Sequence, residues 1–182
     1  SGKAEAVRQG MLRAFESDAR YVGFWDADLA TPLADIEQFA AVLDDNPTLQ
    51  TVFGSRVNLL GRSVRRNLLR HYIGRVFATL AAAVLRLGVY DTQCGAKLFR
   101  NTSENCEIFE SPFLSRWIFD VEIVARLITR YRSSSTPSIR EVIFEYPLMR
   151  WDDVAGSKLT LFDFFVVGLD LWRINWHYYV RR

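Results

Sequence analysis

The sequence predicts an α/β fold: a mostly parallel sheet with helices on both of its faces. Helical and strand-like patterns alternate along the first third of the chain, which is the order expected of parallel strands joined by helices. The chain has 182 residues, of which 49% are apolar and 14% aromatic. This length and composition exclude bulk disorder and favour one domain with a sizeable core.

The first four elements follow from the spacing of apolar residues. Residues 3–15 have the periodicity of an amphipathic helix, and the aromatic and β-branched residues 21–25 are typical of a short strand. Pro32 is expected at the start of the next helix, which runs to about residue 45. Residues 51–53 are predicted to form the second strand.

The later elements are predicted in the same way. A long helical pattern covers residues 64–87, and the alternation of apolar and polar residues over 139–146 indicates a strand with one buried face. The other expected elements are a short strand at 96–99, a helix at 119–131, a surface loop at 133–138 and a strongly apolar, aromatic C-terminal helix at about 159–179.

Composition limits the classes of function. A net charge of +2 is too small to argue for nucleic acid. The two cysteines, Cys94 and Cys106, lack the spacing of zinc ligands, so a reduced, cytosol-facing protein is expected. The longest uncharged apolar run considered, residues 76–85, is well short of the roughly 20 residues that span a bilayer.

Two carboxylates, Asp26 and Asp28, stand where the first predicted strand ends. Residues two apart on a strand project to the same face, so both side chains are expected to aim at one point beyond the strand. Ligands of open α/β sheets bind at such strand ends, and hard oxygen ligands suit Mg²⁺ or Mn²⁺. The alternative is a turn that happens to contain two aspartates.

Cationic side chains occur where they could meet phosphate. Arg56 ends the second strand, and Ser157 and Lys158 lie in a glycine-containing turn. A basic stripe on the predicted helix 64–87 has two readings: a solvated helix face, or contact with a lipid phosphate or anionic headgroups. The stripe consists of Arg65, Arg66, Arg70 and Arg75.

Other carboxylates are ambiguous. Asp120 and Glu122 open the predicted helix 119–131, where the helix dipole favours negative charge, so capping and catalysis are equal alternatives. Asp91 precedes a Thr-Gln-Cys-Gly turn and is ambiguous in the same way.

Taken together, these motifs resemble the family 2 glycosyltransferases. Within that family the chain is most similar to dolichyl-phosphate β-glucosyltransferases and to bacterial polyprenyl-phosphate sugar transferases. The most specific segment is Asp-Thr-Gln-Cys-Gly-Ala-Lys-Leu-Phe at 91–99. The others are Gly-Lys-Ala-Glu-Ala-Val-Arg-Gln-Gly at 2–10, Asp-Ala-Asp at 26–28, Gly-Ser-Arg at 54–56, Trp-Ile-Phe-Asp-Val-Glu at 117–122 and Gly-Ser-Lys-Leu at 156–159.

The resemblance implies a GT-A fold with a Rossmann-like sheet. It implies inverting transfer of a sugar, glucose or mannose, from UDP-glucose or GDP-mannose to a polyprenyl or dolichyl phosphate, with Mg²⁺ or Mn²⁺. Residues 1–182 would form one partial catalytic domain that docks on the cytoplasmic face of a membrane, with a homo-oligomer as a further expectation and no nucleic-acid partner.

The resemblance also implies roles for individual residues. Asp28 would be the principal metal ligand, and Asp26 would contact the nucleotide sugar and help to coordinate the metal. Arg56 is expected near the acceptor phosphate, with Arg70 and then Arg75 as companions. Lys158, beside Ser157, would approach the diphosphate. The sugar and acceptor pocket would be lined by Asp91, Gln93, Lys97, Asp120 and Glu122.

Two departures from the family pattern matter. Many relatives carry a glutamine as a further metal ligand where this chain has Ala30. The family's opening strand and the segments that help to form the nucleotide-base site are also absent, so the chain is expected to be an inactive fragment of a longer protein.

Two other functions stay open. One is a family 2 transferase that acts on a polysaccharide or another hydroxyl acceptor, which would require a general base, with Asp120 or Glu122 as the candidates. The other is a non-catalytic membrane-docking or assembly domain derived from a transferase.

Overall fold

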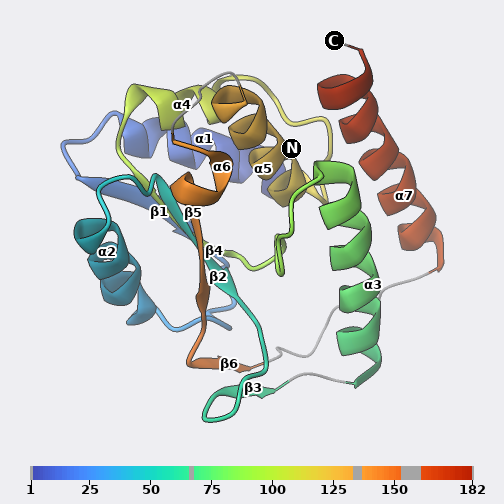
Figure 1. The fold of residues 1–182 in the computed structure, drawn as a ribbon, viewed down its shortest axis with the longest axis horizontal. Coiled ribbons are helices and arrows are strands. Elements are labelled where there is room, and N and C mark those ends of the chain that lie inside the picture. The colour runs from blue at the N-terminus through green and yellow to red at the C-terminus, as the bar shows by residue number, and fades with distance from the viewer. Residues whose placement is uncertain (1, 66–67, 133–136, 153–160, 182) are drawn as a thin grey trace.

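The computed structural model describes residues 2–65, 68–132, 137–152 and 161–181 (Figure 1). Its main sheet has four strands in the order β1-β4-β2-β5. Strands β1, β2 and β5 run in one direction, and β4 lies antiparallel between β1 and β2. The predicted mostly parallel α/β sheet is therefore confirmed, with one reversed strand. The strands are β1 (Tyr21–Trp25), β2 (Thr51–Ser55), β4 (Ala96–Arg100) and β5 (Ile143–Pro147).

Helices cover both faces of this sheet (Figure 1). Helices α1, α4 and α5 lie on one face, and α2 lies on the other. Helix α2 begins three residues after Pro32, which corrects the predicted start. The helices are α1 (Lys3–Phe15), α2 (Asp35–Asp45), α4 (Ser103–Glu110) and α5 (Phe119–Tyr131).

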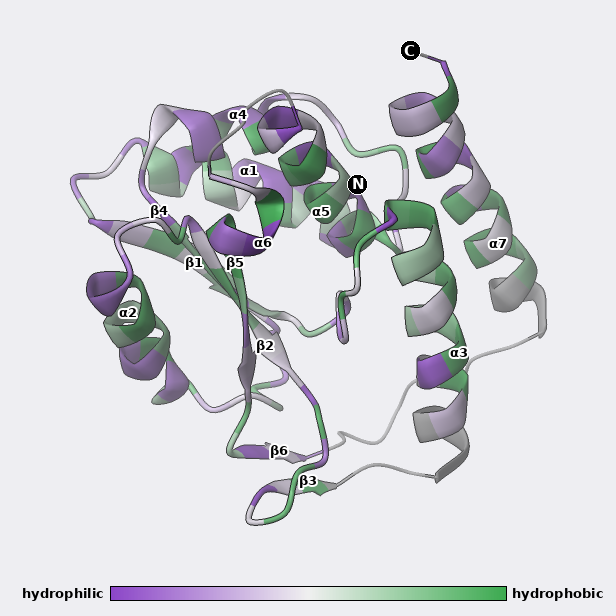
Figure 2. Cartoon of the chain, in the orientation of Figure 1, coloured by the Kyte–Doolittle hydropathy of each residue, from purple (hydrophilic) through white to green (hydrophobic). Residues whose placement is uncertain are grey.

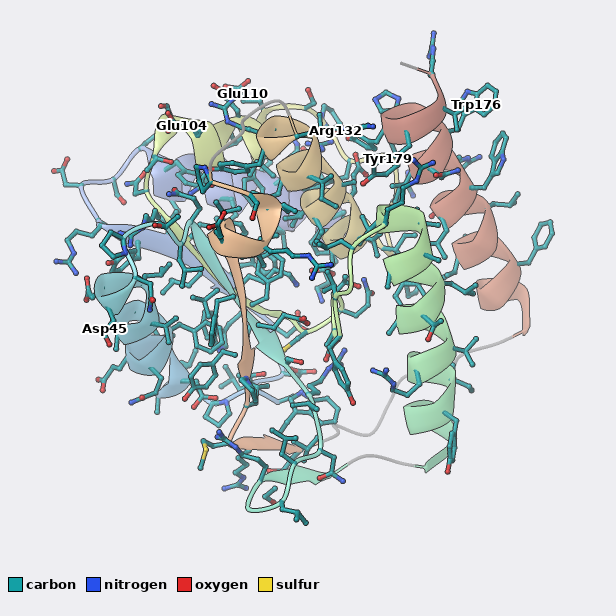
Figure 3. All side chains as sticks on the ribbon, in the orientation of Figure 1. Asp45, Glu104, Glu110, Arg132, Trp176 and Tyr179 are labelled. Atoms are coloured by element: carbon teal, nitrogen blue, oxygen red, sulfur yellow. The ribbon has the colours of Figure 1, made fainter. Side chains whose placement is uncertain are left out.

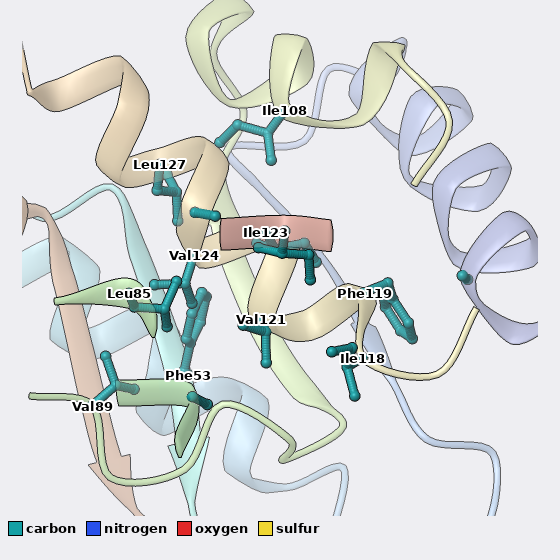
Figure 4. Packing of buried hydrophobic residues seen from close by; sticks show 14 of the residues in the cluster. Phe53, Leu85, Val89, Ile108, Ile118, Phe119, Val121, Ile123, Val124 and Leu127 are labelled. Carbon is teal, nitrogen blue, oxygen red and sulfur yellow. The ribbon is translucent and has the colours of Figure 1, made fainter. Parts of the chain in front are cut away.

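The two faces of the sheet have separate cores because neighbouring strand residues point to opposite sides. Val52 and Leu98 pack with α2, whereas Phe53 and Phe99 pack with α1, α4 and α5. Figure 4 shows Phe53 beside Val124 of α5 and Leu85. The same alternation places Lys97, between Ala96 and Leu98, on the face covered by α5.

A second sheet and a long helix replace the predicted helix 64–87. Strand β3 (Ser63–Arg65) pairs in parallel with β6 (Arg150–Asp152), and α3 spans Leu68–Leu85. Arg65 is therefore on a strand and not on the helix, so the predicted helical stripe is wrong at its start. Arg66 lies outside the described residues.

The predicted strand 139–146 is wrong over its first half. Helix α6 (Ile139–Val142) precedes β5 because Ser138 and Glu141 form a capping box, in which each side chain accepts from the other residue's backbone N–H. Most of the predicted loop 133–138 lies outside the described residues.

The C-terminal segment is helical as predicted. Helix α7 (Leu161–Asn175) continues into the π-helix η1 (Trp176–Val180). Figure 1 shows α7 beside α3, and both helices carry hydrophobic residues along their length (Figure 2). None of the helices in the described part of the chain combines the length and the apolar composition that a bilayer crossing requires.

Candidate active site

Asp26 and Asp28 follow β1 but are presented differently. The backbone N–H of Asp26 donates to the carbonyl oxygen of Gly95 at 2.8 Å, and the chain then turns at Leu29, whose φ is 53°. Asp28 is exposed, and its Oδ1 accepts from the N–H of Ala30 at 3.1 Å. Because the turn begins after Asp26, the strand periodicity that predicted a common direction does not extend to Asp28.

The Asp26 carboxylate is held between a glycine and a cation. A Cβ atom at Gly95 would lie 1.9 Å from Cγ of Asp26, so a side chain at position 95 would displace the carboxylate. On its other side, Oδ1 of Asp26 lies 2.5 Å from Nζ of Lys3. The segment 91–99 therefore contributes to the site through the backbone at Gly95 as well as through side chains.

Arg56 and Asp91 form a nearly buried ion pair at the end of β2. Nε and Nη2 of Arg56 donate to the two carboxylate oxygens of Asp91 at 2.7 and 2.8 Å, and the Arg56 backbone N–H donates to Oδ2 at 3.0 Å. The two side chains are 17% and 9% exposed. The Arg56 guanidinium also lies 5.4 Å from the Trp151 ring centroid. This bidentate geometry fixes the direction of the guanidinium.

Glu145 on β5 holds the loop that carries Asp91. Its carboxylate accepts the backbone N–H of Tyr90 at 2.9 Å and that of Asp91 at 2.8 Å. Farther along the loop, Cys94 packs against Gly54, where a Cβ would lie 2.8 Å from the sulfur. Burial raises the pKa of the Cys94 thiol. The loop is therefore tied to both β2 and β5.

Lys97 and Asp120 form a buried ion pair beneath the same loop. Nζ of Lys97 donates to Oδ1 of Asp120 at 2.5 Å and to the carbonyl oxygens of Thr92 and Cys94 at 3.1 and 2.6 Å. These acceptors match the three donors of an ammonium group. Burial raises the pKa of Asp120, although Lys97 acts to lower it. Lys97, which was predicted to line the substrate pocket, is fully buried, and its hydrogen bonds join the loop to α5.

Glu122 does not join Asp120. Its side chain is fully buried and accepts from the Leu114 N–H at 2.7 Å, from Nη2 of Arg126 at 2.8 Å and from the Tyr178 hydroxyl at 2.9 Å. Two residues along an α-helix correspond to a rotation of about 200°, so the two carboxylates point to different sides of α5. Glu122 therefore links α5 to η1 at the C-terminal end of the chain.

The remaining predicted residues are divided between the loop, α3 and the undescribed part of the chain. Gln93 donates its backbone N–H to Asp91 at 3.1 Å, and its buried Nε2 has no hydrogen-bond partner in the part of the chain that the structure describes. The Arg75 guanidinium lies 4.0 Å from the Tyr90 ring centroid and so joins α3 to the loop. Arg70 lies on α3. Ser157 and Lys158 lie outside the described residues.

The carboxylates fit a divalent cation only in part. Across the described ranges, no three His, Cys, Asp or Glu side chains form a group that could hold a metal ion. Asp28 offers an exposed hard oxygen donor, whereas Asp26 is paired with Lys3. Mg²⁺ commonly binds one or two carboxylates together with substrate phosphates and water. Asp28 therefore suits Mg²⁺ or Mn²⁺ when a diphosphate supplies the other oxygens.

Two site residues were not assigned a role from the sequence. Lys3 belongs to the motif at residues 2–10, but the resemblance implies no role for its side chain. Glu145 sits in the alternating pattern of a strand and is indistinguishable there from a solvent-facing residue. No local pattern shows that its carboxylate receives two backbone N–H groups from residues 90 and 91.

The described site therefore places an arginine with fixed orientation and a lysine-paired carboxylate at one loop, with an exposed carboxylate two residues farther along the chain from the second. Such an arrangement can bind phosphate groups and neutralise a leaving group that becomes negatively charged.

The chain is similar in sequence to known glycosyltransferases. The particular relatives are dolichyl-phosphate β-glucosyltransferases. The chain is 32% identical to the Saccharomyces cerevisiae protein in an alignment of 171 positions that covers 88% of the chain and 47% of that relative. The corresponding values are 32% in an alignment of 189 positions, gaps included, for Drosophila melanogaster (98% and 52% covered) and 30% in one of 187 positions for Homo sapiens (97% and 52%).

These matches confirm the resemblance that the motifs predicted, and the observed α/β architecture is consistent with a GT-A-like fold. No protein-family model matches the chain. The chain spans about half the length of the curated relatives that it matches.

Proposed function

We propose that this chain is part of an inverting glycosyltransferase that moves glucose from UDP-glucose to dolichyl phosphate or another polyprenyl phosphate. The observation that carries the proposal is the similarity to dolichyl-phosphate β-glucosyltransferases over 88% to 98% of the chain. Glucose is preferred to mannose, and UDP-glucose to GDP-mannose, because the names of these relatives specify a glucosyltransferase.

The site geometry supports a phosphate acceptor. A lipid phosphate is already anionic near neutral pH, so it can attack the anomeric carbon without a strong general base. Asp120 is buried against Lys97, and Glu122 is buried with three hydrogen-bond donors, so neither carboxylate is placed as a general base. This burial argues against the alternative of a hydroxyl acceptor on a polysaccharide.

Charge neutralisation is then the main task of the protein. Arg56, oriented by Asp91, would meet the acceptor phosphate, and the cationic groups of the site would reduce its repulsion from the donor diphosphate. Asp28, with Asp26 as a second candidate, would hold Mg²⁺ or Mn²⁺, which when bound supplies positive charge to the departing nucleotide diphosphate. In-line attack on an α-linked donor gives a β-linked product.

Surface properties of α3 and α7 support a lipid-linked substrate. The two helices border an apolar groove of about 270 Å³, lined by Tyr72, Val76, Leu80 and Gly168 among others. Trp176 is 49% exposed and projects from the outer side of the C-terminal helix (Figure 3). Interfacial aromatic residues of this kind suit a membrane surface, and the free cysteines Cys94 and Cys106 suit a reducing compartment, so the cytoplasmic face of a membrane is part of the proposal. A homo-oligomer is part of the same proposal.

A transfer assay with the full-length protein tests this function. Labelled UDP-glucose or GDP-mannose is supplied with Mg²⁺ and with either polyprenyl phosphate or a soluble glycan. Lipid-linked glucose that disappears in Asp28→Ala, but not in the exposed control Asp18→Ala, is the expected result. Label in the glycan alone would support the polysaccharide transferase, and no transfer from any donor would support a non-catalytic domain.

A further inference from the structure

The start of α1 and the end of β1 lie at the same end of the molecule. Helix α1 is roughly 20 Å long, and the following strand β1 runs back for roughly 17 Å. This reversal brings Lys3, the first residue of α1, to Asp26, the first residue after β1. Nζ of Lys3 lies 2.5 Å from Oδ1 of Asp26 and 5.9 Å from the Phe119 ring centroid.

Lys3 differs from the other lysine of the described site in exposure. The Lys97 side chain is fully buried and its three donors have acceptors, whereas the Lys3 side chain is 54% exposed. Among the described residues, Asp26 is the one acceptor of the Lys3 ammonium. Two of its N–H groups are therefore available to a ligand.

We propose that Lys3 is a donor-site residue whose ammonium contacts a phosphate oxygen of the nucleotide diphosphate; this inference rests on the proposed function. In the free protein the ammonium neutralises Asp26, which is the carboxylate packed against Gly95. When the diphosphate enters, Lys3 gains a second anionic partner beside Asp26. Lys3 also competes with a divalent cation for Asp26 while no nucleotide is bound.

Two binding measurements on the full-length protein test the proposal, and neither depends on turnover. The first is titration of UDP at saturating Mg²⁺, where Lys3→Met is expected to bind at least about ten-fold more weakly, because a charged hydrogen bond is lost. Lys3→Arg keeps the charge and is expected to retain most of the affinity. The second is titration of Mn²⁺ without nucleotide, where Lys3→Met is expected to bind about three-fold more tightly or better, because a competing cation is removed.

Arg13→Ala is the matched control, because it removes a positive charge from the exposed last turn of the same helix. Its UDP and Mn²⁺ affinities are expected to equal those of the wild type. If the wild type transfers glucose and binds UDP while Lys3→Met leaves both titrations unchanged, the role of Lys3 is refuted and the proposed function stands. If the wild type neither binds UDP nor transfers a sugar, the proposed function fails and this inference fails with it.

Discussion

Replacing Asp120 by asparagine keeps the size of the side chain but removes the negative charge that faces Lys97. The two side chains are 5% and 0% exposed, and their charged atoms lie 2.5 Å apart. The carbonyl oxygens of Thr92 and Cys94 remain as acceptors in the variant. Asp120→Asn therefore leaves a buried ammonium with hydrogen-bond partners but without its counter-charge.

The cost of this change follows from burial. Removing one partner of a buried ion pair typically costs about 3–5 kcal/mol. The two remaining carbonyl acceptors place the expected loss near the lower limit, at about 3 kcal/mol. For a chain of this size such a loss corresponds to a decrease of roughly 6–12 °C in melting temperature. The exposed control Asp18→Asn is expected to stay within about 0.5 kcal/mol of the wild type.

Urea unfolding followed by tryptophan fluorescence measures the free energy of unfolding for each variant. A double variant, Lys97→Met with Asp120→Leu, removes both charges and is expected to recover most of the loss, since a well-packed apolar pair can replace a buried ion pair. A loss below about 1 kcal/mol in Asp120→Asn, or a double variant less stable than the single one, would refute the electrostatic role assigned to this pair.

Three further predictions concern the loop and the C-terminal helix. Gly95→Ala is expected to lower kcat/KM for UDP-glucose by about 10- to 100-fold, because its Cβ takes the place of the Asp26 carboxylate; unchanged kinetics would contradict that contact. Asp91→Asn is expected to raise KM for polyprenyl phosphate about ten-fold, because Arg56 loses its fixed orientation, and to raise KM for UDP-glucose by less. A larger increase in KM for UDP-glucose than for polyprenyl phosphate would place Arg56 at the donor. Burial and the Glu122 charge raise the pKa of Tyr178 from 10.0 to about 12. The contribution of Tyr178 to the free energy of unfolding is therefore complete below pH 10. It decreases between pH 10 and 12, because there the tyrosine ionises in the unfolded chain before it ionises in the folded protein. After allowance for its partial exposure this contribution is about 1 kcal/mol, and a Tyr178→Phe variant with an unchanged alkaline unfolding profile would exclude it.

The elements with strong periodicity could be predicted from the sequence. Helices α1 and α5 have the predicted bounds because each has a clear apolar period, and strand β1 has them because its aromatic and β-branched residues form a short run that ends at a turn. Helix α6 could also have been found, since Ser138 and Glu141 have the spacing of a capping box. The reversed direction of β4 could not, because it depends on which neighbours the strand meets after the loop.

The short strands β3 and β6 also escape prediction. Each has three residues, and their pairing joins residues 87 positions apart, such as Ser63 and Arg150, so neither segment contains a local signal for the other. Residues 64 and 65 instead continue the apolar and basic pattern of the helix that follows, and this pattern led to the wrong helix start.

The candidate site could also be predicted only in part. The loop 91–95 was identified from its residues, but the orientation of each side chain was not. The sequence presents Asp120 and Glu122 as one pair of carboxylates at the start of a helix, although helical geometry separates residues two positions apart. The role of Lys97 also depends on tertiary structure, because its alternating position on β4 shows which face it occupies but not which acceptors lie there.

The most direct test of the central claim is the position of the metal and diphosphate. Anomalous diffraction from crystals of the full-length protein grown with Mn²⁺ and UDP would locate the ion without any assumption about turnover. We expect a single Mn²⁺ peak next to the Asp28 carboxylate, with the diphosphate between that peak and Lys3. A nucleotide bound with its Mn²⁺ at another place in the fold, or UDP absent from this end of β1, would contradict the account.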